Sequence, residues 1–261
     1  MSIEVSILLV MVVFTLAIFL FHEFARRFIG TVTLFFILAA LSIPFWADNL
    51  QGWFRWAKIL SVMIPLTVVN LARWSHRYPS PKNVFFTGKW VMWMSYIVLV
   101  LNILEATVKD FTLGHTFNGI TGLILIVTIP IAPQKWGVET ESRLNDILFD
   151  LPILWTILYT TWNICFIYGE KPEYTAHVIC ILLVPLFYSV ILRRPDLWYS
   201  ARAYTLAISL YIRATYDVIT PSMNIVHLAD ANMTQNFGLL NLTFGLIFLA
   251  WSFHKGRNNT T

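Results

Sequence analysis

Residues 5–21 read VSILLVMVVFTLAIFLF, an apolar run without a single charged side chain. A helix of about 17 to 25 such residues crosses the apolar core of a bilayer, since each residue adds about 1.5 Å. Glu4 precedes the run, and Arg26 and Arg27 follow it. Basic residues stay on the cytoplasmic side of a membrane, and a cleavable signal peptide carries its basic residues before the apolar run. This stretch therefore predicts an uncleaved transmembrane helix whose N-terminus lies outside.

The whole chain has the same character. Of its 261 residues, 57% are hydrophobic and 12% are charged, and the mean hydropathy is +0.68. Soluble domains carry about 25% charged residues, and disordered chains are poor in hydrophobic ones. We therefore expect one all-α polytopic membrane domain over residues 1–261. The net charge of +4 fits an excess of lysine and arginine in cytoplasmic loops and does not require a nucleic acid partner. Cys165 and Cys180 lie in apolar runs, where a thiol is usually an inert small hydrophobe.

Apolar runs that are separated by polar or proline-containing segments predict nine transmembrane helices. These are Val5–Phe21, Phe28–Trp46, Ala57–Arg73, Trp90–Lys109, Thr116–Ile131, Ile147–Ile167, Tyr174–Leu192, Ala201–Ile219 and Phe237–Phe253. With the N-terminus outside and the C-terminus inside, 13 of the 18 basic residues lie on the inner side and 4 on the outer side. These 17 residues lie in loops or near the ends of spans, and only Arg213 lies well inside a span. The segment Glu139–Asp150 predicts either a short helix in the inner interface or the start of the sixth span.

Three short motifs recur in the same order in the two halves of the chain. The pairs are Pro65 and Arg73 with Pro185 and Arg193, Glu105-Ala-Thr with Arg213-Ala-Thr, and Thr116-Phe-Asn118 with Thr234-Gln-Asn236. Four spans separate the members of each pair, so both copies would have the same orientation. The order predicts an additional N-terminal helix over residues 1–27 and two parallel four-helix repeats over residues 28–133 and 134–261. Chance similarity between apolar segments is the alternative.

Charged residues inside a membrane are costly and therefore indicate function. Arg213 lies near the middle of the eighth predicted span, with Asp217 one helical turn later. Glu105 and Lys109 form a similar pair of opposite polarity in the fourth span, and Asp110 follows directly. If the repeats bring these spans together, Glu105 faces Arg213 and Lys109 faces Asp217. The four charges would form a neutral network that either binds a solute or only fixes helix packing.

Polar and aromatic side chains in other spans complete the candidate binding or gating site. Trp155, Tyr159 and Trp162 share one helical face, which either packs against a neighbouring helix or forms a wall for a planar or cationic ligand. The remaining candidates are amides, each of which alone is usually interhelical glue: Asn102, Asn118 and Asn163.

Several kinds of chemistry lack the residues that they need. No lysine lies in the centre of a span, as a retinal Schiff base requires, and the sequence has no H-E-x-x-H motif, P-loop or dinucleotide-binding glycine motif. Haem ligation by His177 or His227 stays open. We predict no metal and no cofactor, and no catalytic residues.

These patterns leave three hypotheses about function. The first is a small secondary transporter or permease that moves a small polar or charged solute through a cavity lined by the intramembrane charges. The second is a non-catalytic membrane subunit or sensor in which the charges only fix helix packing. The third is a membrane enzyme that acts on lipid or quinone. The expected partners are the lipid bilayer and a small solute, and a homo-oligomer is compatible with the sequence.

Overall fold

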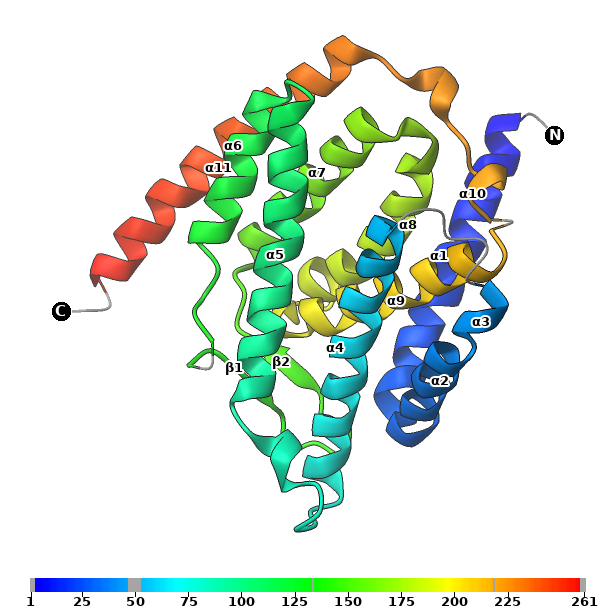
Figure 1. Ribbon diagram of the computed structural model, residues 1–261. Helices are drawn as coiled ribbons and strands as arrows, with labels where there is room; N and C mark the ends of the chain where they lie inside the picture. The colour runs from blue at the N-terminus through cyan, green and yellow to red at the C-terminus, as the bar shows by residue number, and fades with distance from the viewer. Residues whose placement is uncertain (1–2, 47–52, 133, 218, 259–261) are drawn as a thin grey trace.

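A computed structural model describes residues 3–46, 53–132, 134–217 and 219–258, and nearly all of its elements are helices (Figure 1). The helices are α1 (Ile3–Arg27), α2 (Ile29–Leu41), α3 (Ile43–Trp46), α4 (Trp53–Arg77), α5 (Trp90–Thr112), α6 (Thr116–Val127), α7 (Ile153–Glu170), α8 (Thr175–Leu186), α9 (Trp198–Thr215), α10 (Ile219–Ser222) and α11 (Ala231–Asn258). Two short strands, β1 (Trp136–Val138) and β2 (Ile147–Phe149), form an antiparallel hairpin. A π-helical turn, Phe187–Ile191, continues α8.

Each of the nine predicted segments contains a helix, and the all-α class is confirmed. Among the described residues, five helices are long and apolar enough to cross a membrane: Glu4–Arg27, Trp56–Arg77, Trp90–Thr112, Pro172–Ile191 and Asn232–His254. α2 and α6 are apolar but shorter. The structure thus supports a helical membrane protein with several spans, while the count of nine and the orientation stay predictions.

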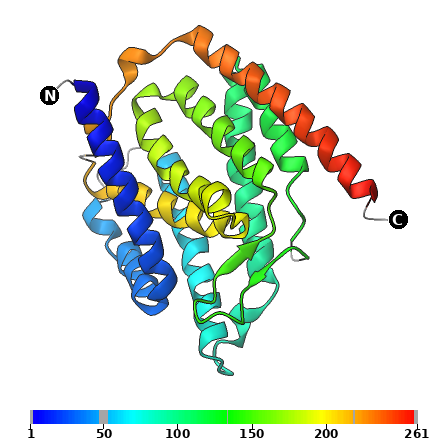
Figure 2. The same ribbon diagram turned by 180° about the vertical axis from the view of Figure 1, so that it is seen from behind.

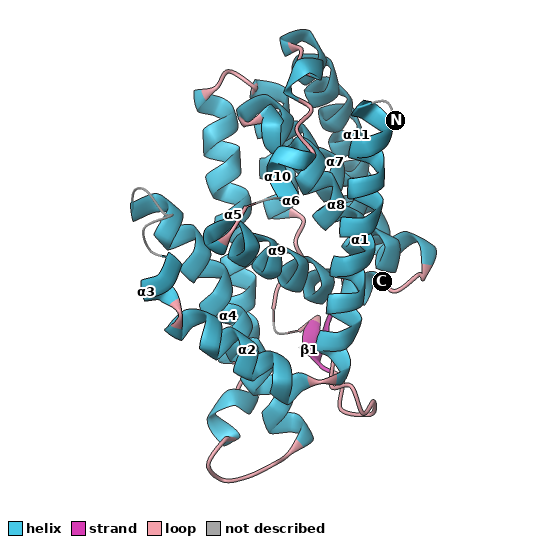
Figure 3. Ribbon diagram, turned by 90° about the vertical axis from the view of Figure 1, so that its right-hand side faces the viewer, coloured by secondary structure: helices cyan, strands magenta, loops and turns pink. Residues whose placement is uncertain are grey.

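The helices do not all run in one direction. α4 and α5 lie side by side, whereas α9 lies across them in both the front view and the side view (Figures 1 and 3). α1 and α11 occupy opposite flanks of the molecule, which is clearest from behind (Figure 2). From α9 the chain passes through α10 and rises to the end of the molecule where α11 begins (Figure 1).

The outer helices present apolar side chains that no other part of the described chain covers. Leu8, Val13 and Leu20 on α1 are 59–64% exposed, and Leu240 and Ile247 on α11 are 68% and 63% exposed. Exposed apolar surface of this extent is unfavourable in water and suits contact with lipid. The central helix α7, in contrast, is surrounded by other helices. It packs against α5, α6, α8 and α11, so it faces protein and tolerates polar residues.

The segment Glu139–Asp150 is not a helix, so both readings of it as part of a helix are wrong. Its second half forms strand β2, and Asn145 has a positive φ of 48°, which a helix does not allow. The hairpin is held by aromatic stacking. The ring centres of Trp136 and Phe149 lie 3.7 Å apart, and those of Phe149 and Tyr199 lie 3.8 Å apart.

A buried ion cluster ties this hairpin loop to the helices. Asp146 is fully buried and accepts hydrogen bonds from Arg26, the shortest at 2.7 Å. Arg73 is 1% exposed and lies 3.5 Å from the Asp146 carboxylate, and it also donates to the backbone carbonyls of Leu144 and Asn145. The sequence places both arginines on the inner side, in a loop or near the end of a span. Instead they are structural, because the loop carbonyls and Asp146 satisfy them.

The predicted duplication has no clear counterpart in the packing. In the first predicted repeat, α5 packs closely against α6. The helix of the second predicted repeat that corresponds to α6 is α11, but α11 packs against α6 and α7. The repeat therefore stays a prediction that rests on the sequence motifs.

Candidate functional site

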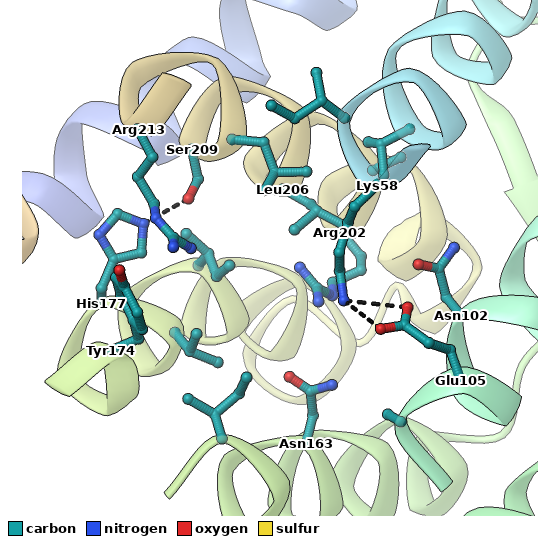
Figure 4. Close-up of a pocket in the computed structure, with 18 of the residues that line it drawn as sticks. Lys58, Asn102, Glu105, Asn163, Tyr174, His177, Arg202, Leu206, Ser209 and Arg213 are labelled. Atoms are coloured by element: carbon teal, nitrogen blue, oxygen red, sulfur yellow. Dashed lines mark hydrogen bonds and ion pairs between the residues drawn. The ribbon is translucent and has the colours of Figure 1, made fainter. Parts of the chain in front are cut away.

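A cavity of about 520 Å³ lies between α4, α5, α7, α8 and α9. Its lining combines aliphatic with polar and charged side chains, including Glu170 and Glu173, and Figure 4 shows two of its polar groups in close-up. Of the residues predicted from sequence, six line it: Glu105, Asn102, Tyr159, Asn163, Arg213 and Asp217. The other four, Lys109, Asp110, Asn118 and Trp162, are not among its lining residues.

The first polar group is centred on an ion pair between α4 and α5. Lys58 Nζ donates to both carboxylate oxygens of Glu105, at 3.0 and 3.2 Å (Figure 4). The side chains are 36% and 34% exposed, so the pair lies where the cavity meets the surface. An exposed pair of this kind contributes about 0–1 kcal/mol, which leaves both groups able to exchange partners.

The predicted pairing of Glu105 with Arg213 is wrong. α4 packs against both α5 and α9, and it supplies Lys58 as the nearer cation. The predicted pairing of Lys109 with Asp217 is wrong as well, because Lys109 is exposed and lies outside the cavity. Glu105 and Arg213 nevertheless line the same cavity.

The second polar group surrounds Arg213 at the end of α9. Its Nε lies 3.8 Å from Asp217 Oδ2, as the spacing of four residues predicted. Asp217 also caps α10, because its Oδ1 accepts the backbone N–H of Thr220 at 3.0 Å. The Arg213 guanidinium carbon lies 4.0 Å from the centre of the Tyr174 ring, a cation–π contact. Arg213 belongs to the last turn of the helix, since α9 ends at Thr215, and not to its middle as predicted.

Two cavity residues that the sequence did not single out as a pair are hydrogen-bonded beside Arg213. His177 Nε2 and Ser209 Oγ lie 2.5 Å apart, and both side chains are 1% exposed (Figure 4). They come from α8 and α9, which pack against each other. Residues so far apart in sequence give no local signal of a pair.

Arg202 is a further lining residue, and the sequence places it on the inner side at the start of the predicted span Ala201–Ile219. It lies in the second turn of α9 and is 8% exposed. Its Nε lies 3.4 Å from the Tyr159 hydroxyl, and its guanidinium carbon is 5.9 Å from the Tyr159 ring centre. Counting basic residues in loops cannot find such a residue, because it treats every arginine near a predicted span end as solvated.

Three of the four predicted residues outside the cavity form a buried network that joins α5, α6, α7 and α11. Asn118 donates to Asp110 at 2.8 Å and accepts from Asn241 at 3.1 Å. Its backbone carbonyl accepts the indole N–H of Trp162 at 3.0 Å. Burial lowers the pKa of His115, whose Nδ1 lies 3.5 Å from Asp110. These contacts fix helix packing.

The aromatic face of α7 divides between packing and the cavity. Trp155 and Trp162 are fully buried, and the Trp155 indole donates to the Leu125 carbonyl at 3.2 Å. Tyr159 alone of the three reaches the cavity. In the part of the chain that the structure describes, no group of three or more His, Cys, Asp or Glu side chains could hold a metal ion.

The fold and the site together define a class: a helical membrane protein with a cavity that carries charges of both signs. The chain belongs to DUF5692, a family of unknown function whose model matches residues 1–260. No curated protein and no solved structure matches the chain.

Proposed function

We propose that the protein is a small transporter that takes a small polar or charged solute into the cavity between α4, α5, α7, α8 and α9. The observation that carries the proposal is that one cavity is lined by both Glu105 and Arg213. A volume of about 520 Å³ is within the range of about 300–1,000 Å³ that is typical of small-molecule sites. Charges that only fix helix packing would not need a cavity of this size.

The two ion pairs suit a site that opens and closes. Among the described residues, Glu105 and Arg213 each have one side-chain partner of opposite charge, and both are about one-third exposed. A charged solute can therefore replace a partner without leaving a fully buried charge unpaired, which would cost about 3–5 kcal/mol. In this proposal the Lys58–Glu105 and Arg213–Asp217 pairs are alternately made and broken as the solute passes.

The proposal includes nine membrane crossings with the N-terminus outside. In support, each of the nine predicted segments contains a helix, and α9 with the chain that follows it reaches the end of the molecule where α11 begins. In this orientation, the cavity faces the outer side of the membrane near the start of α4 and the end of α5. A fluorescent protein fused to the C-terminus should fluoresce, because it folds inside the cell, and alkaline phosphatase fused there should be inactive. The opposite result would contradict the orientation.

Uptake into proteoliposomes tests the function. Radiolabelled monocarboxylates, amino acids and polyamines serve as probes, and we expect Arg213→Ala and Glu105→Gln to abolish uptake of the probe that the wild type accumulates. Lys109→Ala is the matched control, since it removes a charge one helical turn from Glu105 but outside the cavity. Normal uptake by both cavity variants, or equal loss in Lys109→Ala, would contradict the proposal.

The His177–Ser209 hydrogen bond favours a second candidate, a hydrolase for an ester within the membrane. Ser209 Oγ would attack the acyl carbon while His177 takes its proton, the alcohol would leave with that proton, and water would then release the acid. Arg213 would stabilise the oxyanion. A fluorophosphonate probe should then label the wild type and not Ser209→Ala. Absence of labelling in the folded wild type would exclude this candidate.

A further inference from the structure

We infer that Arg202 is the anchor of an anion site in the cavity, and that its ligand is the carboxylate of a small organic acid. This inference rests on the proposed function, because it gives the class of the solute. The starting observation is that Arg202 lines the cavity while more than nine-tenths of its side chain is buried.

Arg202 differs from the other arginines of the interior in having no anionic partner within the described chain. Its guanidinium contacts the hydroxyl and the ring of Tyr159, which is uncharged, and its Nη1 has no hydrogen-bond partner among the described residues. In contrast, Arg26 and Arg73 both meet Asp146, and Arg213 meets Asp217. A buried guanidinium without a counter-charge is unfavourable. An anion that enters the cavity would provide this counter-charge, so its binding beside Arg202 is favoured.

The guanidinium of Arg202 is suited to a carboxylate, as it is to a phosphate, and the cavity walls decide between them. A guanidinium presents a planar fork of N–H donors that matches a carboxylate with two parallel hydrogen bonds. In Figure 4 Arg202 and Asn163 point toward the same part of the cavity, so the Asn163 amide can orient the bound group. The nearby Lys58 is already paired with Glu105, so this pair adds no net positive charge.

The cavity walls select an apolar body for the same ligand. Val69, Leu99, Ile181 and Leu206 come from four different helices and line the cavity together with Arg202. A chloride or phosphate ion would leave these walls without contacts, whereas an aliphatic chain fills the space and removes apolar surface from water. A short-chain monocarboxylic acid in its ionised form satisfies both features.

Binding of hexanoate to the full-length protein in detergent, measured by isothermal titration calorimetry, tests the inference. Hexanamide is the matched neutral probe, since it differs from hexanoate only in the group that would meet Arg202. We expect saturable binding of hexanoate by the wild type and at least tenfold weaker binding of hexanamide. This comparison needs no variant. Equal binding of the two probes, binding of neither, or tighter binding of inorganic phosphate than of hexanoate would overturn the inference.

Variants then locate the site. Arg202→Gln should weaken hexanoate binding at least tenfold, and Arg202→Lys should fall between this variant and the wild type, because it keeps the charge without the fork. Arg77→Gln, at an exposed position near the end of α4, should bind as the wild type does. Unchanged binding in a folded Arg202→Gln variant would also overturn the inference. If hexanoate binds at Arg202 but no probe is taken up by proteoliposomes, the transport proposal fails and the anion site stands. If uptake depends on Glu105 and Arg213 but not on Arg202, the transport proposal stands and the anion site at Arg202 fails.

Discussion

Replacing Asp146 by asparagine removes one charge and keeps the shape of the side chain. Asp146 is fully buried, receives hydrogen bonds from Arg26 at 2.7, 3.1 and 3.2 Å, and lies 3.5 Å from Arg73, which is 1% exposed. The variant removes the carboxylate beside Arg73 and leaves Arg26 with Glu23, at 2.7 Å, as its anionic partner among the described residues. Removing one partner of a buried pair costs about 3–5 kcal/mol.

The expected loss is large enough to measure by thermal unfolding in detergent. For a protein of this size, 1 kcal/mol corresponds to about 2–4 °C, so Asp146→Asn should lower Tm by about 6–20 °C. Asp150→Asn is the matched control. Asp150 lies 3.2 Å from Lys135, but both side chains are at least 60% exposed, and a pair of this kind contributes about 0–1 kcal/mol.

The two variants change the same residue type at the two ends of strand β2, so the difference between them isolates burial. A Tm shift in Asp146→Asn no larger than that in Asp150→Asn would refute the claim that the hairpin is fastened through Asp146. It would also mean that Arg26 and Arg73 find other partners.

The remaining predictions concern the packing around α6, with a glycine of strand β1 as the control, and their effects on stability can be measured by the same thermal unfolding. Gly122→Ala should destabilise by about 1–3 kcal/mol, because the new Cβ would overlap the Thr107 hydroxyl and lie 3.2 Å from the Trp162 ring. Gly137→Ala, whose Cβ would have no neighbour within 4 Å, should leave Tm within about 1–2 °C of the wild type. Asn118→Ala should cost about 2–4 kcal/mol through the loss of its side-chain hydrogen bonds, with uptake per folded molecule unchanged. Loss of uptake in a folded Asn118→Ala variant would show that the network acts in function as well as in packing.

The helices could be predicted from the sequence because their signal is local. An apolar run bounded by charges is sufficient to place a helix in lipid, and α1 and α5 begin and end within about six residues of the expected bounds. The hairpin could not be predicted in this way. Its strands have three residues each, and its stability comes from Arg73, Asp146 and stacked rings that lie far apart in the sequence.

The sequence predicts only some of the site residues, because only some of them have a local signal. A charge in an apolar run is conspicuous, which is why Glu105 and Arg213 were found. Their partners depend on how helices pack, and α4 brought Lys58 to Glu105 where the motif order had suggested Arg213. Arg202 lies at the start of the predicted span Ala201–Ile219, where an arginine is expected to reach the interface, so only the packing of α9 shows that it is buried.

The central claim is that a water-filled cavity reaches Glu105 and Arg213, and cysteine accessibility tests it most directly. The natural thiols Cys165 and Cys180 are free and buried, and serines replace them in the background variant. Asn102→Cys lies on the cavity wall, whereas Ser95→Cys lies on the same helix at a fully buried position that is not among the lining residues. A charged, membrane-impermeant methanethiosulfonate added from outside should modify Asn102→Cys rapidly and leave Ser95→Cys unmodified. An unreactive Asn102→Cys in folded protein, or equal reaction at both positions, would contradict the account.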